Sequence, residues 1–353
     1  MMHGHLASLA QLLVAGGRGV LAADEPPAVY NARFPAFGIA PTQERRRAYR
    51  ELLLGTPDIE RYVSAAILHD ETMRQSARDG ARFADRLRER GIMPGVRVDA
   101  GTTPLPFSPG ETVTEGLDGL RARLSEYAAL GAGFATWRAT FRITGVGDGT
   151  PSDRAIGANA HASARFAALA QECGLVPFVD AEVLADGDHD VAPCAYAGER
   201  VLRRLFAELA EAGVALDAMI LQTGMIAPGL DSAQRVTTAD VVGETLRVLG
   251  ATVPVAVAGI AFVSDADAGP DGVERLCAMN KTSPRRRPWP LTFAYGRSLR
   301  HAALAAWRGD DDRVSDARRV VLHHAFRHSL AACGAYSEAR DRLAALPGAM
   351  RVA

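Results

Sequence analysis

The sequence predicts one α/β domain built as a (β/α)8 barrel. Eight short apolar or small-residue segments recur about every 30 to 45 residues, with helical patterns between them, which is the spacing of a TIM barrel. No linker or low-complexity segment divides the 353 residues, so we expect a single domain over 1–353, with an N-terminal helix in 1–16 and a C-terminal tail over 338–353. A doubly wound sheet is the alternative, but it favours a glycine-rich turn after the first strand, where this chain has Asp24-Glu25-Pro26-Pro27.

The expected strands and helices alternate along the chain. Strands are expected at residues 19–24, 64–71, 93–101, 134–140, 175–182, 217–229, 253–264 and 287–297. Their apolar, small-residue character is typical of parallel strands that are buried on both faces. Helices are expected at 7–15, around 45–54, and at 115–130, 158–174, 198–213 and 238–250.

The composition excludes several kinds of partner. Forty basic residues balance 41 acidic ones, and the formal net charge of −1 offers no excess that would attract nucleic acid or an anionic membrane surface. No segment approaches the roughly 18 apolar residues of a membrane span, and the N-terminus lacks the cationic start of a secretion signal. We therefore expect a cytoplasmic protein that acts on a small-molecule substrate, without a nucleic-acid or membrane partner.

Cysteine and lysine usage limits the available chemistry. The four cysteines are widely spaced and form no C-x-x-C pair, so we expect reduced, structural thiols. No histidines accompany them at the spacing of a zinc site, and we expect neither a bound metal nor a cofactor. Lys281 is the only lysine of the chain.

Polar side chains occur where the expected strands end. In a (β/α)8 barrel the C-terminal ends of the strands meet at one face, where the chemistry is carried out. We therefore expect one pocket formed by Asp24, His69, Arg97, Arg138, Asp180, Glu182, Gln222, Ser264 and Arg297, with Thr136 facing the same way as Arg138 by strand alternation.

Several stretches resemble the class I fructose-bisphosphate aldolases in their order and spacing. They include GRGVLAADE, GVRVDAGTTPL, VPFVDAEVLADGDHD and NKTSPRRRPWPLTFAYGRSL, and the resemblance runs from about residue 17 to about residue 337. It implies the same barrel and, because such aldolases are commonly tetramers, a homo-oligomer that is a dimer or a tetramer.

The resemblance implies roles for individual positions. The residues that match the family's functional positions are Asp24, Arg138 and Glu182, together with Ser264 and Arg297, which match a serine and an arginine that hold a substrate phosphate. Asp180 stands where the family has a glutamate and is shorter by one methylene. Arg97 replaces a lysine and remains cationic, with a planar fork in place of a point charge.

Other positions depart from the family. Gln222 stands at the position of the lysine that forms the Schiff base, and Thr136 at that of a second active-site lysine. An amide cannot form an imine, and Lys281 precedes the eighth strand, so we expect it on the face opposite the pocket. We therefore expect a divergent enzyme that does not carry out the ordinary fructose-bisphosphate aldolase reaction.

The acids of the pocket suggest acid/base catalysis. Asp180 and Glu182 are two residues apart on a strand and share a face, roughly 6 to 7 Å apart at their Cα atoms. With Asp24 opposite, mutual repulsion would leave one acid and one base, suited to carbon–carbon condensation, cleavage or dehydration of a small polar carbonyl or amine-bearing metabolite. Gln222 would bind a carbonyl or hydroxyl group, and the arginines an anionic one.

Three alternatives stay open. The acids and arginines also fit a buried ion network without catalysis, as in an aldolase-fold protein that binds a sugar phosphate or regulates. A metal-dependent lyase would use Asp24, His69, Asp180 and Glu182 as hard ligands. His69 itself fits a packed, hydrogen-bonded histidine as well as a proton-transfer or substrate-binding residue.

Overall fold

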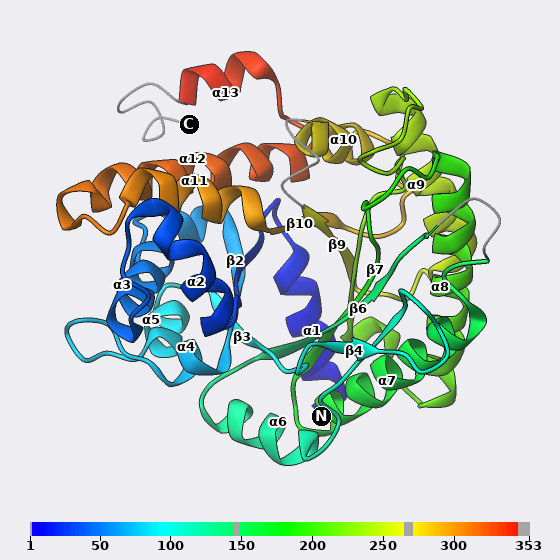
Figure 1. Cartoon of the computed structure of the whole chain (residues 1–353), viewed down its shortest axis with the longest axis horizontal. Helices are drawn as coiled ribbons and strands as arrows, with labels where there is room; N and C mark the ends of the chain where they lie inside the picture. Colours follow the sequence, from blue (N-terminus) through cyan, green and yellow to red (C-terminus); the bar gives the residue numbers. More distant parts are fainter. Residues whose placement is uncertain (1, 145–148, 265–270, 345–353) are drawn as a thin grey trace.

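The strands form a closed parallel barrel, as expected (Figure 1). The computed structural model describes residues 2–144, 149–264 and 271–344. The barrel strands are β1 (Gly19–Ala23), β2 (Val63–Leu68), β3 (Met93–Arg97), β6 (Phe134–Phe141), β7 (Val176–Val183), β8 (Ile220–Thr223), β9 (Gly259–Ser264) and β10 (Leu291–Tyr295). Their order around the barrel is β1-β10-β9-β8-β7-β6-β3-β2, which confirms the prediction of a single-domain (β/α)8 barrel.

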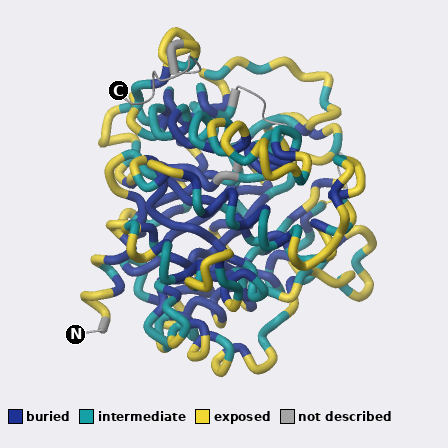
Figure 2. Tube along the Cα trace, turned by 90° about the vertical axis from the view of Figure 1, so that its left-hand side faces the viewer, coloured by how far each residue is buried: buried dark blue, intermediate teal, exposed yellow. Residues whose placement is uncertain are grey.

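Helices surround the barrel and cover its outer face. They are α1 (Met2–Val14), α2 (Pro27–Arg33), α3 (Gln43–Leu54), α4 (Asp70–Arg74), α5 (Phe83–Glu89), α6 (Leu120–Ala129), α7 (Asp153–Glu172), α8 (Val191–Glu211), α9 (Thr238–Thr252), α10 (Asp271–Asn280), α11 (Arg297–Trp307), α12 (Val314–Ala332) and α13 (Glu338–Ala344). Buried residues concentrate along the central strands and exposed ones at the periphery (Figure 2). Burial on both faces explains why the strands read as apolar runs.

The N-terminal helix α1 closes the floor of the barrel. Its apolar residues Leu6, Leu9, Leu13 and Val14 recur at helical spacing and pack with inward-facing residues of the strands. A side chain at Gly259 would come within 2.7 Å of Val14, so only glycine allows β9 and α1 to approach this closely. The helix and the barrel interior thus form one small core below the polar mouth.

The strand register aligns polar residues in rows at the other end. Arg138 of β6 pairs with Asp180 of β7, which pairs in turn with Gln222 of β8. Arg97 of β3 pairs with Thr136 of β6. Parallel register therefore brings residues that are far apart in sequence to the same level of the barrel.

Several element boundaries differ from the expected ones: α6 begins at Leu120 and not at 115, α8 begins at Val191 and not at 198, and β3 ends at Arg97 and not at 101. The segment 217–229 holds only the short strand β8, because the 3-10 helix η3 (Leu216–Ala218) precedes it and a loop follows Thr223. Strand β9 begins at Gly259 and not at 253, since a turn closes between Pro254 and Val257. The antiparallel pair β4 (Thr102–Pro104) and β5 (Thr112–Thr114) was not anticipated.

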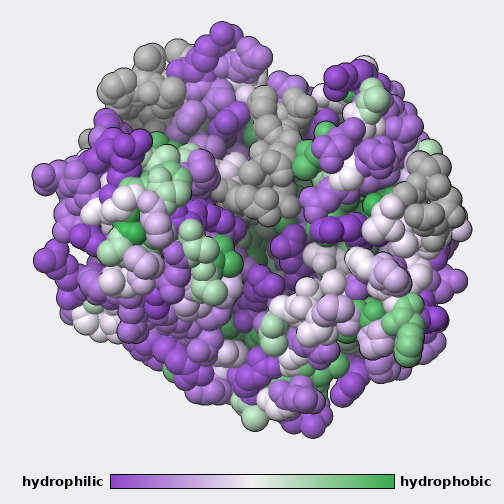
Figure 3. Space-filling view, viewed as in Figure 1, coloured by the Kyte–Doolittle hydropathy of each residue, from purple (hydrophilic) through white to green (hydrophobic). Residues whose placement is uncertain are grey.

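The surface is largely polar. On the face drawn in Figure 3, the described hydrophobic residues form small, separated patches among hydrophilic ones. Within the described ranges, we find no helix with both the length and the apolar character needed to cross a bilayer.

A buried ion cluster joins α3 to α4. The Glu71 carboxylate accepts hydrogen bonds from Arg46 at 2.8 and 3.1 Å and from Arg50 at 2.7 Å. Arg50 has no exposed surface, so its charge depends on this carboxylate and on Gln75, whose side-chain oxygen lies 2.9 Å away. Breaking such a pair leaves an uncompensated buried charge.

We expect Glu71→Ala to lower the free energy of unfolding by about 3 to 5 kcal/mol, because Arg50 stays buried without its carboxylate. Urea unfolding monitored by circular dichroism measures the loss. The control is Glu44→Ala, which removes an exposed partner of Arg47 on the same helix and should cost less than about 1 kcal/mol. Equal losses in the two variants would contradict this assignment.

Candidate functional site

A polar cavity of about 420 Å³ lies at the C-terminal ends of the strands. All eight strands of the barrel and the segments that follow β1 and β10 supply its walls. Its polar lining residues are Asp24, Glu25, Arg33, Arg97, Thr136, Arg138, Asp180, Gln222 and Arg300. The structure therefore brings together six of the ten residues expected from the sequence and adds three that were not.

Arg97 and Arg138 are each held by carboxylates. The Arg97 guanidinium donates to Asp99 at 2.8 to 3.1 Å, and its Nη1 atom lies 3.7 Å from Asp24. Arg138 donates from Nε to Glu182 at 3.1 Å, and the same nitrogen lies 3.5 Å from Asp180. Charges removed from water need such partners, and each guanidinium is oriented by its acids.

Asp180 is the acid whose protonation is most altered. It is 5% exposed, and burial raises its pKa to about 8, although the charge of Arg138 opposes the shift. Its Oδ1 atom has no hydrogen-bond partner among the described residues. At neutral pH Asp180 is therefore mainly a protonated carboxylic acid, which can donate a proton.

Glu182 does not line this cavity but a neighbouring one. It lies two residues beyond Asp180 on β7, is 5% exposed, and forms an ion pair with Arg138. Asp180 and Glu182 thus share one guanidinium, and the arginine separates two acids that would otherwise repel each other.

Gln222 and Thr136 form a neutral pair on the cavity wall. The Thr136 hydroxyl donates to the side-chain oxygen of Gln222 at 3.1 Å, and both residues are buried. These are the two positions at which the aldolase resemblance implies amines. Among the described residues the cavity has no lysine in its lining: Lys281 is exposed and follows α10, at the end of the barrel where β10 begins.

Glu25, Arg33 and Arg300 were missed by the sequence analysis. Arg33 lies 2.9 Å from Glu25, and Arg300 contacts both Glu25 and Asp24. Glu25 directly follows Asp24, and Arg300 lies about one helical turn after Arg297. Their positions in the sequence could therefore have indicated that they belong to the site.

The other residues expected at the site are His69, Ser264 and Arg297. His69 is not among the residues lining the cavity; its Nδ1 atom accepts from the amide of Glu71 at 3.1 Å and caps α4, and burial lowers its pKa. Ser264 ends β9 and Arg297 begins α11, but their side chains lie outside the part of the chain that is described. Within the described ranges, no three His, Cys, Asp or Glu side chains are grouped to hold a metal ion.

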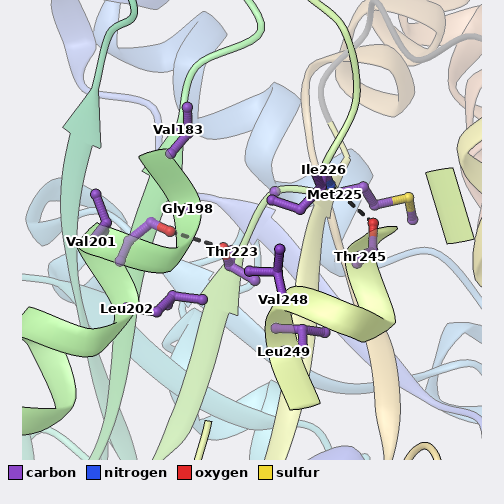
Figure 4. A pocket seen from close by; sticks show the side chains of 12 residues that line it. Val183, Gly198, Val201, Leu202, Thr223, Met225, Ile226, Thr245, Val248 and Leu249 are labelled. Carbon is purple, nitrogen blue, oxygen red and sulfur yellow. Dashed lines mark hydrogen bonds between the residues drawn. The ribbon is translucent and has the colours of Figure 1, made fainter. Parts of the chain in front are cut away.

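A further pocket, distinct from the cavity that Glu182 lines, lies outside the barrel and is too small for a substrate. It has a volume of about 10 Å³, room for about one water molecule, between β8 and helices α8 and α9 (Figure 4). Thr223 donates to the Ala181 carbonyl at 2.9 Å, and the Ile226 amide donates to Thr245 at 3.0 Å. These bonds fix the end of β8 and the loop that follows it, next to Gln222 in the chain.

Comparisons with known proteins agree with this architecture. The family model described as fructose-bisphosphate aldolase class-I matches residues 5–348. A probable fructose-bisphosphate aldolase class 1 of Xylella fastidiosa is 47% identical, with 93% of this chain and 97% of the relative covered. The cytosolic fructose-bisphosphate aldolase 4 of Arabidopsis thaliana is 41% identical, over 91% and 80%.

A solved structure is also similar. Fructose-bisphosphate aldolase from Plasmodium falciparum superposes with a TM-score of 0.92 at 38% identity, covering 95% of this chain and 96% of that one. The likeness therefore extends to the three-dimensional arrangement of nearly the whole chain.

These relatives overturn one expectation. From Gln222 and Thr136 we expected a divergent enzyme without ordinary fructose-bisphosphate aldolase activity. Proteins that are 38 to 47% identical over most of the chain are named fructose-bisphosphate aldolases, so ordinary aldolase function is what the comparisons support and the expectation was wrong. The expectation rested on two positions, Gln222 and Thr136, whereas the similarity to these aldolases extends over nearly the whole chain. By family model, sequence and structure, this chain belongs to the class I fructose-bisphosphate aldolase family.

Proposed function

We propose that this chain is a lyase that catalyses the fructose-bisphosphate aldolase reaction, the reversible cleavage of fructose 1,6-bisphosphate into two triose phosphates. The observation that carries the proposal is the 47% identity, over 93% of the chain, to a relative named for this activity. The polar cavity at the barrel mouth is the place where such chemistry is expected in this fold.

The cavity contains groups that suit this reaction. In cleavage, a base removes the hydroxyl proton, the carbon–carbon bond breaks, and its electron pair moves toward a polarised carbonyl; a proton donor then completes the step. We assign proton donation to Asp180, because it is protonated at neutral pH, and proton acceptance to Asp24 or Glu182. Gln222 is assigned a catalytic contact to the substrate beside Asp180.

Phosphate binding is assigned to the cationic side chains. Arg97 and Arg138 reach the cavity from adjacent strands, and guanidinium forks match phosphate oxygens well. The aldolase resemblance adds Ser264 and Arg297, and Thr136 completes the wall by holding Gln222. His69 remains a predicted substrate contact that nothing tests.

The proposal extends to the cellular setting and the assembly. We propose a cytoplasmic location, since an Arabidopsis relative is named cytosolic and a Spinacia oleracea relative a cytoplasmic isozyme. We also propose a homo-oligomer, either a dimer or a tetramer. The division into an N-terminal helix, one barrel domain and a tail from residue 338 stays a prediction.

The activity itself is the first test. Purified protein incubated with fructose 1,6-bisphosphate should form two triose phosphates, followed by a coupled assay and by NMR of the mixture. A protein that binds the bisphosphate without cleaving it would contradict the proposal. Borohydride trapping with intact mass, on the wild type and on Lys281→Arg, measures separately whether the carbonyl is held as an imine at the only lysine.

We expect Arg138→Gln to lower kcat/KM at least about 100-fold, because the guanidinium orients two acids and is assigned to the substrate anion. Steady-state kinetics measure the loss. Arg142→Gln is the matched control, since Arg142 follows the same strand, pairs with Asp186 at 2.9 Å and is exposed. It should change kcat/KM less than about twofold; similar losses in both variants would remove Arg138 from the site.

The pH dependence tests Asp180. Because burial raises its pKa to about 8, the proton-donating form is present at neutral pH and is lost as the pH rises through that value. We expect kcat/KM for cleavage to fall above pH 8 in the wild type. The residual activity of Asp180→Asn should lack this basic limb, and an unchanged limb in that variant would exclude Asp180 as the donor.

A further inference from the structure

Two neighbouring carboxylates lie at the mouth of the barrel. Asp24 and Glu25 directly follow β1, and their side chains are only 18% and 10% exposed. Adjacent acids with little access to water repel each other, so one of them would take up a proton unless cations lie close by.

Arg300 lies between these two acids. Its Nη1 atom is 3.4 Å from Asp24 Oδ1 and its Nη2 atom is 3.3 Å from Glu25 Oε1. The same Nη1 atom also donates to the main-chain carbonyl of Ala22 at 2.7 Å, two residues before Asp24 in the sequence. One guanidinium therefore contacts the strand and both carboxylates that follow it.

The backbone that carries Arg300 is itself anchored. The buried hydroxyl of Tyr49, on α3, donates to the Arg300 carbonyl at 2.6 Å. Helix α11 follows β10, and β10 is the barrel neighbour of β1. Arg300 thus connects the last strand–helix unit of the chain to the end of the first strand.

The other cations near these acids each contact one acid, whereas Arg300 contacts both. Asp24 faces Arg97 on its other side at 3.7 Å, while Glu25 faces Arg33 at 2.9 Å. Among the described residues, Arg300 is the side chain that forms ion pairs with both acids. Burial would lower the pKa of Arg300, but the charges of Glu25 and Asp24 outweigh it and raise that pKa.

We propose that Arg300 is a positioning residue of the active cavity, which keeps the Asp24 carboxylate oriented between two guanidinium groups. The proposal rests on the proposed function and specifies how one of its assigned proton acceptors is held. Arg300 acts through Asp24, because both of its terminal nitrogens already contact protein oxygens.

Kinetics distinguish positioning from direct binding of the substrate. Arg300→Met should lower kcat at least about tenfold and change KM less than about threefold, because Asp24 loses its orientation while the groups assigned to phosphate binding remain. Arg300→Lys should restore part of kcat. A rise in KM alone, with kcat unchanged, would overturn the proposal and make Arg300 a substrate ligand.

A matched variant separates the contact with Asp24 from the contact with Glu25. Arg33 lies 2.9 Å from Glu25, whereas Arg300 contacts Asp24 as well. Arg33→Met should therefore lower kcat several-fold less than Arg300→Met does. Equal losses of kcat in the two variants would overturn the proposal.

A structural measurement separates this proposal from the proposed function. Crystal structures of the wild type and of Arg300→Met compare the position of the Asp24 carboxylate without any turnover. In Arg300→Met the carboxylate should leave the place that it holds between Arg97 and Arg300 in the wild type, while the rest of the barrel is unchanged. If wild-type protein does not cleave fructose 1,6-bisphosphate, the proposed function fails; if the Asp24 carboxylate keeps its place in Arg300→Met, the role of Arg300 fails.

Discussion

The ion pairs around the cavity follow from one constraint: a charged group that is removed from water must lie beside a group of opposite charge. In this barrel the constraint is met across neighbouring elements. Arg138 joins β6 to the acids of β7, and Arg300 joins α11 to the end of β1. The pairs that keep buried charges stable are therefore also the contacts that set the shape of the cavity.

Much of the fold was predictable because parallel strands buried on both faces appear in the sequence as continuous apolar runs. The misplaced strand boundaries occur where a turn or loop is equally apolar. Residues 253–258 are as apolar as a strand, but they form the turn before β9, with Pro254 accepting the closing hydrogen bond. The β4–β5 pair consists of two three-residue strands, too short to produce a periodic pattern.

The site was predictable where a residue ends a strand and not where it pairs across the barrel. Strand position alone placed Asp24, Arg97, Asp180 and Gln222 at the cavity. Arg300 is 276 residues from Asp24, and only closure of the barrel brings them together. His69 also ends a strand, yet its ring caps the next helix, because a local backbone partner lies two residues away.

The floor of the barrel gives the cavity a direction. Helix α1 packs in one apolar cluster with Phe134 and Phe178, whose tilted rings have centroids 4.4 Å apart. The polar cavity that Gln222 lines therefore lies at one end of the barrel, while apolar side chains fill the other. A ligand of this cavity meets polar groups on its walls and an apolar core beneath them.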